Sequence, residues 1–314
     1  MLLFLGAVVW ALARAGFFER DLVNQGGWTL AARFLRASLH PDLSLDFLRL
    51  TLDATITTLS FAVCGTCLAL LFGFVGGILA SEVWWESLLP GRGRWARRLR
   101  GYRGPWLVTR SALAFPRAIH EIIWGLIFVS LFGLDPLTAI LAIAIPFGAI
   151  IAKVFSEILD ETPRAPYLAL RNSGVAPPLA FAYTLLPQAF RDGLSYGFYR
   201  FECAIRAAAV LGIIGAGGLG YQIFLSLQTL KYEQIWTLLF ALFLLNGLAD
   251  LWSSVLRRRL GSTVSCSGGA CLDLDTISQS SRRLGDQQRD PIIRVSLIVA
   301  VLLIPFSFWY VAPD

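Results

Sequence analysis

The chain has 314 residues, of which 56% are hydrophobic and 15% are charged. Disordered chains are poor in hydrophobic residues and soluble domains carry about 25% charged residues, so this composition excludes a disordered protein and argues against a soluble globule. The formal net charge of +6 does not indicate nucleic-acid binding, because the arginines gather beside apolar runs, as the topology of membrane proteins requires.

Seven apolar runs are candidates for membrane-spanning helices, each of which needs about 20 mostly apolar residues. They cover roughly residues 1–17, 54–80, 106–132, 136–156, 190–214, 234–256 and 292–311. The runs do not alternate between apolar and polar residues as the strands of a membrane barrel do. We therefore expect an all-α, polytopic membrane helical bundle with about six to seven transmembrane helices. In the second run, Gly73 and Gly77 form a small-xxx-small pair, which predicts close helix packing.

Arginine positions predict the orientation of these helices, because positive loops remain in the cytoplasm. The loop after the second run contains Arg92, Arg94, Arg97, Arg98, Arg100 and Arg103. Arg257, Arg258 and Arg259 close the sixth run. Counting spans between these clusters places the N-terminus and residues 157–189 inside and the loop 18–53 outside. We expect a multi-pass protein of the plasma (inner) membrane with a cytoplasmic N-terminus and an outer C-terminus.

The predicted cytoplasmic segment 157–189 carries the most informative spacing. Gly174 and Pro187 lie thirteen residues apart. Ala169 lies five residues before Gly174, and Leu186 lies directly before Pro187. The segment resembles the ATPase-coupling motif of ABC importer permeases, in which Glu-Ala-Ala is followed by Gly and then by Ile-x-Leu-Pro. Ala169, Gly174, Leu186 and Pro187 match this motif, whereas Leu168 and Thr184 replace its Glu and Ile. The resemblance implies two short helices joined by a turn at Gly174, which form a knob that docks in an ATPase; the alternative is an ordinary proline-rich loop.

A wider resemblance covers about residues 50–260. The family pattern Arg-Ala-x-Pro-Glu occurs as Arg117 to Glu121, with His120 in place of Pro. The pattern Tyr-Arg-Phe-Glu-x-x-x-Arg is complete from Tyr199 to Arg206, and Gly-Ala-Gly-Gly-Leu-Gly is complete from Gly215 to Gly220. These stretches are similar to the permease subunits of phosphonate/phosphate-type ABC importers. Methionine-type importers share the glycine stretch, so a permease for another small solute is the alternative.

This resemblance implies a type I ABC importer permease fold without catalytic groups or cofactors in this chain. It implies four kinds of partner: a dimer of ATPase subunits that use ATP and Mg, a periplasmic or extracellular substrate-binding protein, a second permease subunit that is identical or homologous, and the lipid bilayer. Phosphonate, phosphite or phosphate is the implied solute. No nucleic-acid partner is expected.

Charged side chains within apolar runs are costly and are often functional. Six such residues are candidates for a translocation path: Arg117, His120, Glu121, Arg200, Glu202 and Arg206. The alternative is that these charges pair with one another and lock the helices together. Gly215, Gly217, Gly218 and Gly220 predict a break in the helix that allows close packing or a re-entrant bend.

Two motif matches point to other functions but lack the required context. The spacing G-x-G-x-x-G from Gly215 suggests a dinucleotide site, yet Ile235 stands where an acidic residue is needed. His120-Glu121 begins H-E-x-x-H, but Trp124 replaces the second histidine, so a zinc site is not expected. A membrane enzyme would need a nucleophile with a base or a metal cluster. An ion-coupled secondary transporter, the remaining alternative, usually shows internal repeats.

The expected organisation has four parts. They are an N-terminal transmembrane helix with its outer loop (1–53), the permease transmembrane domain (54–260), a polar cytoplasmic linker (261–291) and an extra C-terminal transmembrane helix (292–314). This last helix is either a simple anchor or the first helix of a second permease copy.

Overall fold

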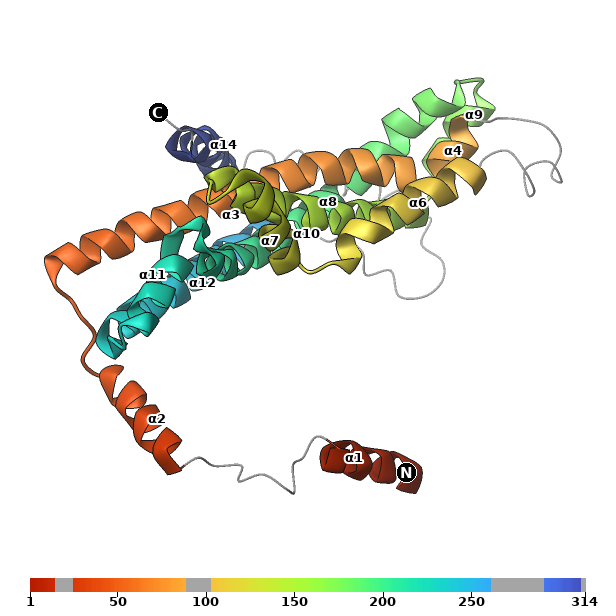
Figure 1. Ribbon diagram of the computed structural model, residues 1–314. Helices are drawn as coiled ribbons and strands as arrows, with labels where there is room; N and C mark the ends of the chain where they lie inside the picture. Colours follow the sequence, from red (N-terminus) through yellow and green to blue (C-terminus); the bar gives the residue numbers. More distant parts are fainter. Residues whose placement is uncertain (15–24, 89–102, 261–290, 312–314) are drawn as a thin grey trace.

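The computed structural model describes residues 1–14, 25–88, 103–260 and 291–311. Within these ranges every regular element is a helix and there is no strand (Figure 1). The helices are α1 (Leu2–Arg14), α2 (Gln25–Ala37), α3 (Leu45–Ala80), α4 (Glu82–Leu88), α6 (Arg103–Ala118), α7 (Glu121–Phe132), α8 (Pro136–Glu161), α9 (Ala165–Asn172), α10 (Pro177–Leu211), the π-helical turn η1 (Gly212–Ala216), α11 (Gly218–Gln228), α12 (Tyr232–Leu260) and α14 (Pro291–Val311). The all-α prediction is confirmed.

Helices α3 and α8 cross at the centre of the bundle, and small residues allow them to approach closely. A Cβ atom added to Gly73 would lie 2.5 Å from Cγ2 of Ile151. A Cβ atom added to Gly77 would lie 2.7 Å from Cδ1 of Phe155. The close packing predicted from this glycine pair is therefore confirmed. Phe61 and Ile143 are among the large side chains that are fully buried beside this crossing.

Three helices of the described chain are long and apolar enough to cross a membrane: α3, α8 and residues Tyr232–Leu256 of α12. The number rises to five if each of two bent helix pairs forms one span. These numbers refer to the described residues alone, whereas the sequence predicts six to seven spans over the whole chain. Of the first expected span, 1–17, the structure describes α1 (Leu2–Arg14), and residues 15–17 lie outside the described part.

The helices do not begin and end where the apolar runs do. The helix that contains the second expected span, 54–80, begins at Leu45, so the expected outer loop 18–53 contains α2 and the first turns of α3. The charges Asp46, Arg49 and Asp53 obscured this helix start in the sequence. A helix of 36 residues is about 54 Å long, so α3 can project beyond a bilayer and expose these charged turns to water.

The third expected span, 106–132, is two helices rather than one. Helices α6 and α7 meet at an angle of 85°. The break follows Pro116, which lies in the last turn of α6, and His120 caps the start of α7. Proline removes a backbone donor and clashes with the preceding turn, which explains why the helix ends there.

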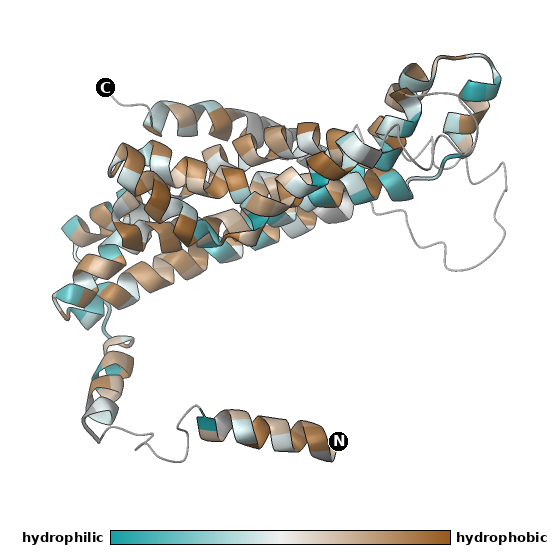
Figure 2. Cartoon of the chain, turned by 45° about the vertical axis from the view of Figure 1, so that its right-hand side comes forward, coloured by the Kyte–Doolittle hydropathy of each residue, from teal (hydrophilic) through white to brown (hydrophobic). Residues whose placement is uncertain are grey.

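The two ends of the bundle contain different elements. Helices α4 and α9 lie at one end, and α2 lies with the turn between α11 and α12 at the other (Figure 1). Apolar residues run along most of the bundle, and hydrophilic residues gather towards both of its ends (Figure 2). Helix α1 stands apart from the other helices in both views. The predicted arginine-rich loop 89–102 and the linker 261–290 lie outside the described residues.

Candidate functional site

The predicted coupling segment forms a helix, a sharp turn and a second helix. Helix α9 ends at Asn172, and Gly174 follows with φ +87°. The N–H of Gly174 donates to the carbonyl of Arg171, and the N–H of Val175 donates to the carbonyl of Leu170, both at 3.1 Å. These two bonds form a Schellman motif, which terminates a helix and favours glycine because its φ is positive. The expected turn at Gly174 is present.

The second helix is longer than expected. It does not end after a short piece, because α10 continues from Pro177 through Pro187 to Leu211. Pro187 occupies the helix interior, where proline usually bends or breaks a helix. The second helix of the predicted knob is therefore the start of α10, which continues into the bundle. We name residues 165–187 the knob.

One side of the knob is packed and the other is open. Tyr167 of α9 is buried in a cluster with Phe155, Phe181 and Leu185. Tyr183 and Leu168 are 72% and 53% exposed. Of the four expected coupling residues, Ala169, Gly174 and Pro187 are exposed, and Leu186 is partly buried against the same cluster. The arrangement gives an apolar surface at the end of the bundle on an anchored base.

Three of the predicted path residues lie at the break between α6 and α7. Nδ1 of His120 accepts a hydrogen bond from the N–H of Ile122 at 3.3 Å and lies 3.5 Å from Oε2 of Glu121. The indole of Trp124 donates to the carbonyl of Pro116 at 3.1 Å and so bridges the two helices. Arg117, in the last turn of α6, is exposed. His120 thus acts as a helix cap here.

The other predicted charges lie on α10. The guanidinium of Arg200 is 4.8 Å from the ring centroid of Phe147 and 5.8 Å from that of Tyr196. Such cation–π contacts stabilise a cation away from water. Arg206 is exposed, and its Nη2 lies 3.5 Å from Sγ of Cys203. Glu202 is partly buried one turn before Arg206. Arg200 therefore faces α8, whereas Arg206 remains open to a partner or solute.

The glycine stretch breaks the helical path between α10 and α11, which meet at 55°. Gly215, Gly217 and Gly218 all have positive φ, between +74° and +103°. A Cβ atom on Gly220 would collide with the carbonyl of Ala209. The bend is also held from α3, because the N–H of Leu219 donates to Oγ1 of Thr58 at 2.9 Å. Sequence reasoning missed Thr58, since a threonine within an apolar helix carries no distinctive pattern.

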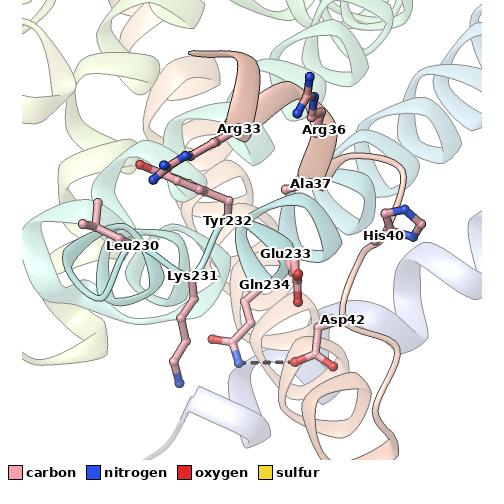
Figure 3. Close-up of a pocket in the computed structure, with 10 residues that line it drawn as sticks. All are labelled: Arg33, Arg36, Ala37, His40, Asp42, Leu230, Lys231, Tyr232, Glu233 and Gln234. Carbon is pink, nitrogen blue, oxygen red and sulfur yellow. Dashed lines mark hydrogen bonds between the residues drawn. The ribbon is translucent and has the colours of Figure 1, made fainter. Parts of the chain in front are cut away.

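A polar pocket lies between α2 and the start of α12 (Figure 3). Helix α2 lies at the opposite end of the bundle from α9 of the knob (Figure 1). It has a volume of about 570 Å³ and is lined by Arg33, Arg36, Ala37, His40, Asp42, Leu230, Lys231, Tyr232, Glu233 and Gln234. Figure 3 shows its side chains coming from α2, the following loop and the start of α12. The sequence reasoning treated this region as a loop, although an amphipathic pattern over 25–37 could have indicated α2.

Asp42 ties the wall of this pocket together. Its Oδ1 accepts from the N–H of Ser44 at 3.0 Å, and its Oδ2 accepts from Nε2 of Gln234 at 3.3 Å. The hydrogen bond from the Ser44 backbone lowers the pKa of the Asp42 carboxyl. The indole of Trp236 donates to the carbonyl of Phe34 at 2.7 Å. The rings of Trp236 and Phe34 also contact each other, with centroids 5.1 Å apart and an interplanar angle of 35°. These contacts hold α2 against the start of α12.

Within the described residues no cluster of three or more His, Cys, Asp or Glu residues could hold a metal ion. The cavities and polar groups described above contain no nucleophile with a positioned base. The described residues form a knob with exposed apolar side chains at one end, broken helices with arginines within the bundle, and a polar pocket at the other end.

Comparison with known proteins agrees with this arrangement. A family model described as "Binding-protein-dependent transport system inner membrane component" matches residues 104–262. The phosphite transport system permease protein PtxC of Stutzerimonas stutzeri is 29% identical over 203 residues, which cover 65% of this chain and 68% of that protein. The phosphate-import permease protein PhnE of Mycolicibacterium smegmatis is 26% identical over 207 residues, which are 66% of this chain but 36% of that protein.

Solved structures share the fold at lower identity. A methionine ABC transporter, MetNI, in an inward-facing conformation aligns with 70% of this chain and all of its own, with 21% identity and a TM-score of 0.57. An amino acid ABC transporter with histidines aligns with 69% of this chain, with 19% identity and a TM-score of 0.54. Because the family model covers half of the sequence, the chain belongs to the binding-protein-dependent transport system inner membrane components, the permease components of ABC importers.

Proposed function

We propose that the chain is the permease subunit of an ATP-driven, binding-protein-dependent importer for phosphonate, phosphite or phosphate. The observation that carries this proposal is the knob. It presents exposed Leu168 and Tyr183 at the end of the bundle while Tyr167 anchors it in the core. Exposed apolar side chains on a rigid base are typical of a surface that docks in the groove of another protein.

In this proposal a dimer of ATPase subunits binds the knobs of two permease subunits, which are identical or homologous. ATP and Mg bind to the ATPase subunits and not to this chain. Closure of the ATPase dimer moves the knobs and shifts the permease between inward-open and outward-open states, as a ligand that prefers one state shifts any two-state equilibrium. The residues proposed to make this contact are Ala169, Gly174, Leu186 and Pro187.

The solute class follows from the relatives and from the arginines. Curated relatives are named for phosphite, phosphate and phosphonate transport. A guanidinium binds a tetrahedral oxyanion through paired hydrogen bonds, and Arg206 is exposed on α10 where such an anion could reach it. Arg117, His120 and Glu121 at the α6–α7 break are proposed to line the same path, with Arg200 and Glu202 holding α10 in place.

The sidedness is also part of the proposal. The knob lies at the cytoplasmic end, and the polar pocket around Asp42 faces the periplasm or the cell exterior. The first apolar run crosses the membrane once more, which places the N-terminus in the cytoplasm. A soluble binding protein delivers the anion to that face. The glycine break at Gly215–Gly220 lies between the pocket and the arginines of α10, where a bend can open or close the path.

Uptake measurements test the solute class. Cells that express the chain with its neighbouring transport genes should accumulate labelled phosphate, phosphite or methylphosphonate, and excess unlabelled oxyanion should compete. Methionine should not compete, and dissipating the proton gradient at constant cellular ATP should leave uptake intact. Uptake that competes with methionine would favour a methionine-type permease. Uptake that collapses with the ion gradient would favour a secondary transporter.

A further inference from the structure

Asp160 is the second-last residue of α8. Its carboxylate binds the junction between α3 and α4. Its Oδ1 accepts hydrogen bonds from Oγ of Ser81 at 2.7 Å and from the backbone N–H groups of Glu82 and Val83 at 2.9 and 3.3 Å. Ser81 is the residue at which α3 ends and after which α4 begins. One side chain of α8 therefore fixes the direction in which the chain leaves α3.

The second oxygen of the same carboxylate binds α6. Nη2 of Arg110 donates to Oδ2 of Asp160 at 3.3 Å, and Nε of Arg110 donates to the carbonyl of Ala80 at 3.2 Å. The guanidinium also lies 4.6 Å from the ring centroid of Trp106. Arg110 is a residue of α6, and its guanidinium bridges the ends of α3 and α8. We name the set Ser81, Glu82, Val83, Arg110 and Asp160 the Asp160 junction.

The Asp160 junction lies directly beside the knob. Asp160 is five residues before Ala165, the first residue of α9. A second contact joins the same segments, since Nη1 of Arg164 lies 3.5 Å from Oε2 of Glu86 in α4. Tyr167 of α9 and Val83 of the junction belong to one buried cluster. A displacement of α9 therefore acts on the end of α8 and on α4 together.

Helix α6 leads from the junction to the candidate path. Arg110 lies two turns before Arg117, and α6 then ends at the 85° break before α7. Helix α3 connects the junction to Thr58, whose hydroxyl accepts the hydrogen bond from Leu219 beside the glycine break. The Asp160 junction thus connects the end of α8, which precedes the knob, to α3 and α6. Helix α6 reaches the α6–α7 break, and α3 reaches the glycine break.

We propose that Asp160 is a positioning residue that transmits movement of the knob to α3 and α6; the proposal rests on the proposed import function. Hydrogen bonds to a charged group are stronger and more directional than neutral ones. Four donors from two segments, the α3–α4 junction and α6, converge on one carboxylate of α8, so the ends of α3, α6 and α8 move as one unit. Without the carboxylate, α8 and α9 can move without moving α3 and α6.

A second ion pair on α8 provides a matched control. Nζ of Lys153 lies 2.9 Å from Oε1 of Glu157, and both residues belong to α8. This pair is exposed, and Glu157 lies three residues before Asp160, but the bond joins two residues of the same helix. Exposed pairs of this kind contribute little to stability. Glu157→Gln therefore removes a nearby charge without breaking a bond between two helices.

The test uses the intact transporter with its ATPase and binding protein in proteoliposomes. Import of whichever of labelled phosphate, phosphite or methylphosphonate the unmodified complex transports is measured beside ADP release. We expect Asp160→Ala to lower import per ATP hydrolysed by about fivefold or more, in the range of energetic coupling between distant sites, while the ATPase still co-purifies. Glu157→Gln should retain the ratio of the unmodified complex, and Asp160→Glu should recover part of it.

Arg110→Gln keeps the bonds from Asp160 to Ser81 and Val83 and covers the case in which Asp160→Ala does not fold. It should lower the same ratio by a smaller factor, and in the double variant Arg110→Gln with Asp160→Asn the two effects should not add. An unchanged ratio in Arg110→Gln and Asp160→Ala, or an equal loss of import and hydrolysis in both, would overturn the proposal. An unmodified complex that lacks an ATPase would instead overturn the proposed function.

Discussion

The backbone N–H of Leu219 donates a 2.9 Å hydrogen bond to the hydroxyl of Thr58, 161 residues earlier in the chain. The same hydroxyl donates to the carbonyl of Ala54 one turn before it in α3. Thr58 is 1% exposed. The bond therefore ties the first turn of α11, directly after the glycine break, to the longest helix of the bundle.

Replacing Thr58 by valine should destabilise the glycine break. Valine has the same shape but lacks the acceptor, and a buried N–H without a partner costs about 1–3 kcal/mol. We expect a lower melting temperature of the purified protein in detergent. Thr58→Ser keeps the hydroxyl and should melt closer to the unmodified protein. Equal melting temperatures for the valine and unmodified proteins would show that the bond contributes nothing.

Replacing Gly220 by alanine should disrupt the same region through steric overlap. The added Cβ atom would collide with the carbonyl of Ala209, a backbone atom that cannot turn away. We expect loss of the folded protein or a destabilisation of several kcal/mol, as overpacking in close-packed interiors produces. Gly247→Ala, where no atom lies within 4 Å of the added Cβ, is the control and should fold normally.

Replacing Gly174 by proline should abolish coupling to the ATPase without preventing membrane insertion. Proline fixes φ near −65°, whereas Gly174 has φ +87°, so the Schellman turn cannot form. Gly174→Asn should be tolerated because asparagine adopts positive φ more readily than most residues. Membrane yield and import are the measurements. Import at the unmodified rate by the proline variant would contradict the role of the turn.

Replacing Arg206 by alanine should reduce import more than assembly. The side chain is exposed on α10, and its Nη2 lies 3.5 Å from Sγ of Cys203. Removal therefore leaves the packing of α10 in place. We expect normal co-purification with the ATPase and a raised half-saturating concentration for the anion. Loss of the assembled complex would favour the helix-locking role instead.

Part of this site could be predicted from the sequence because its signals are local. Gly174 lies at a fixed distance from Pro187, and only a few residue types end a helix in this way, so the turn was predictable. The glycines at 215–220 likewise predict a break wherever they occur. The length of α10 was not predictable, since prolines at 177, 178 and 187 suggested short pieces, whereas burial of Phe181 and Leu185 keeps this segment helical.

The remaining features depend on contacts between distant segments. The pocket around Asp42 combines residues of α2 with residues of α12 that lie about 200 positions later. Single-sequence patterns contain no such pairing, so the sequence could supply the arginines and glycines but not their partners.

Co-purification tests the central claim most directly. The tagged chain, extracted gently from native membranes, should bring an ATPase subunit with it in a fixed ratio to the permease. The same extraction of the Gly174→Pro variant should yield the chain with the ATPase reduced or absent, while Gly174→Asn should keep it. A chain that is recovered at full yield without any ATPase, in several detergents, would contradict the assignment of the knob and with it the importer mechanism.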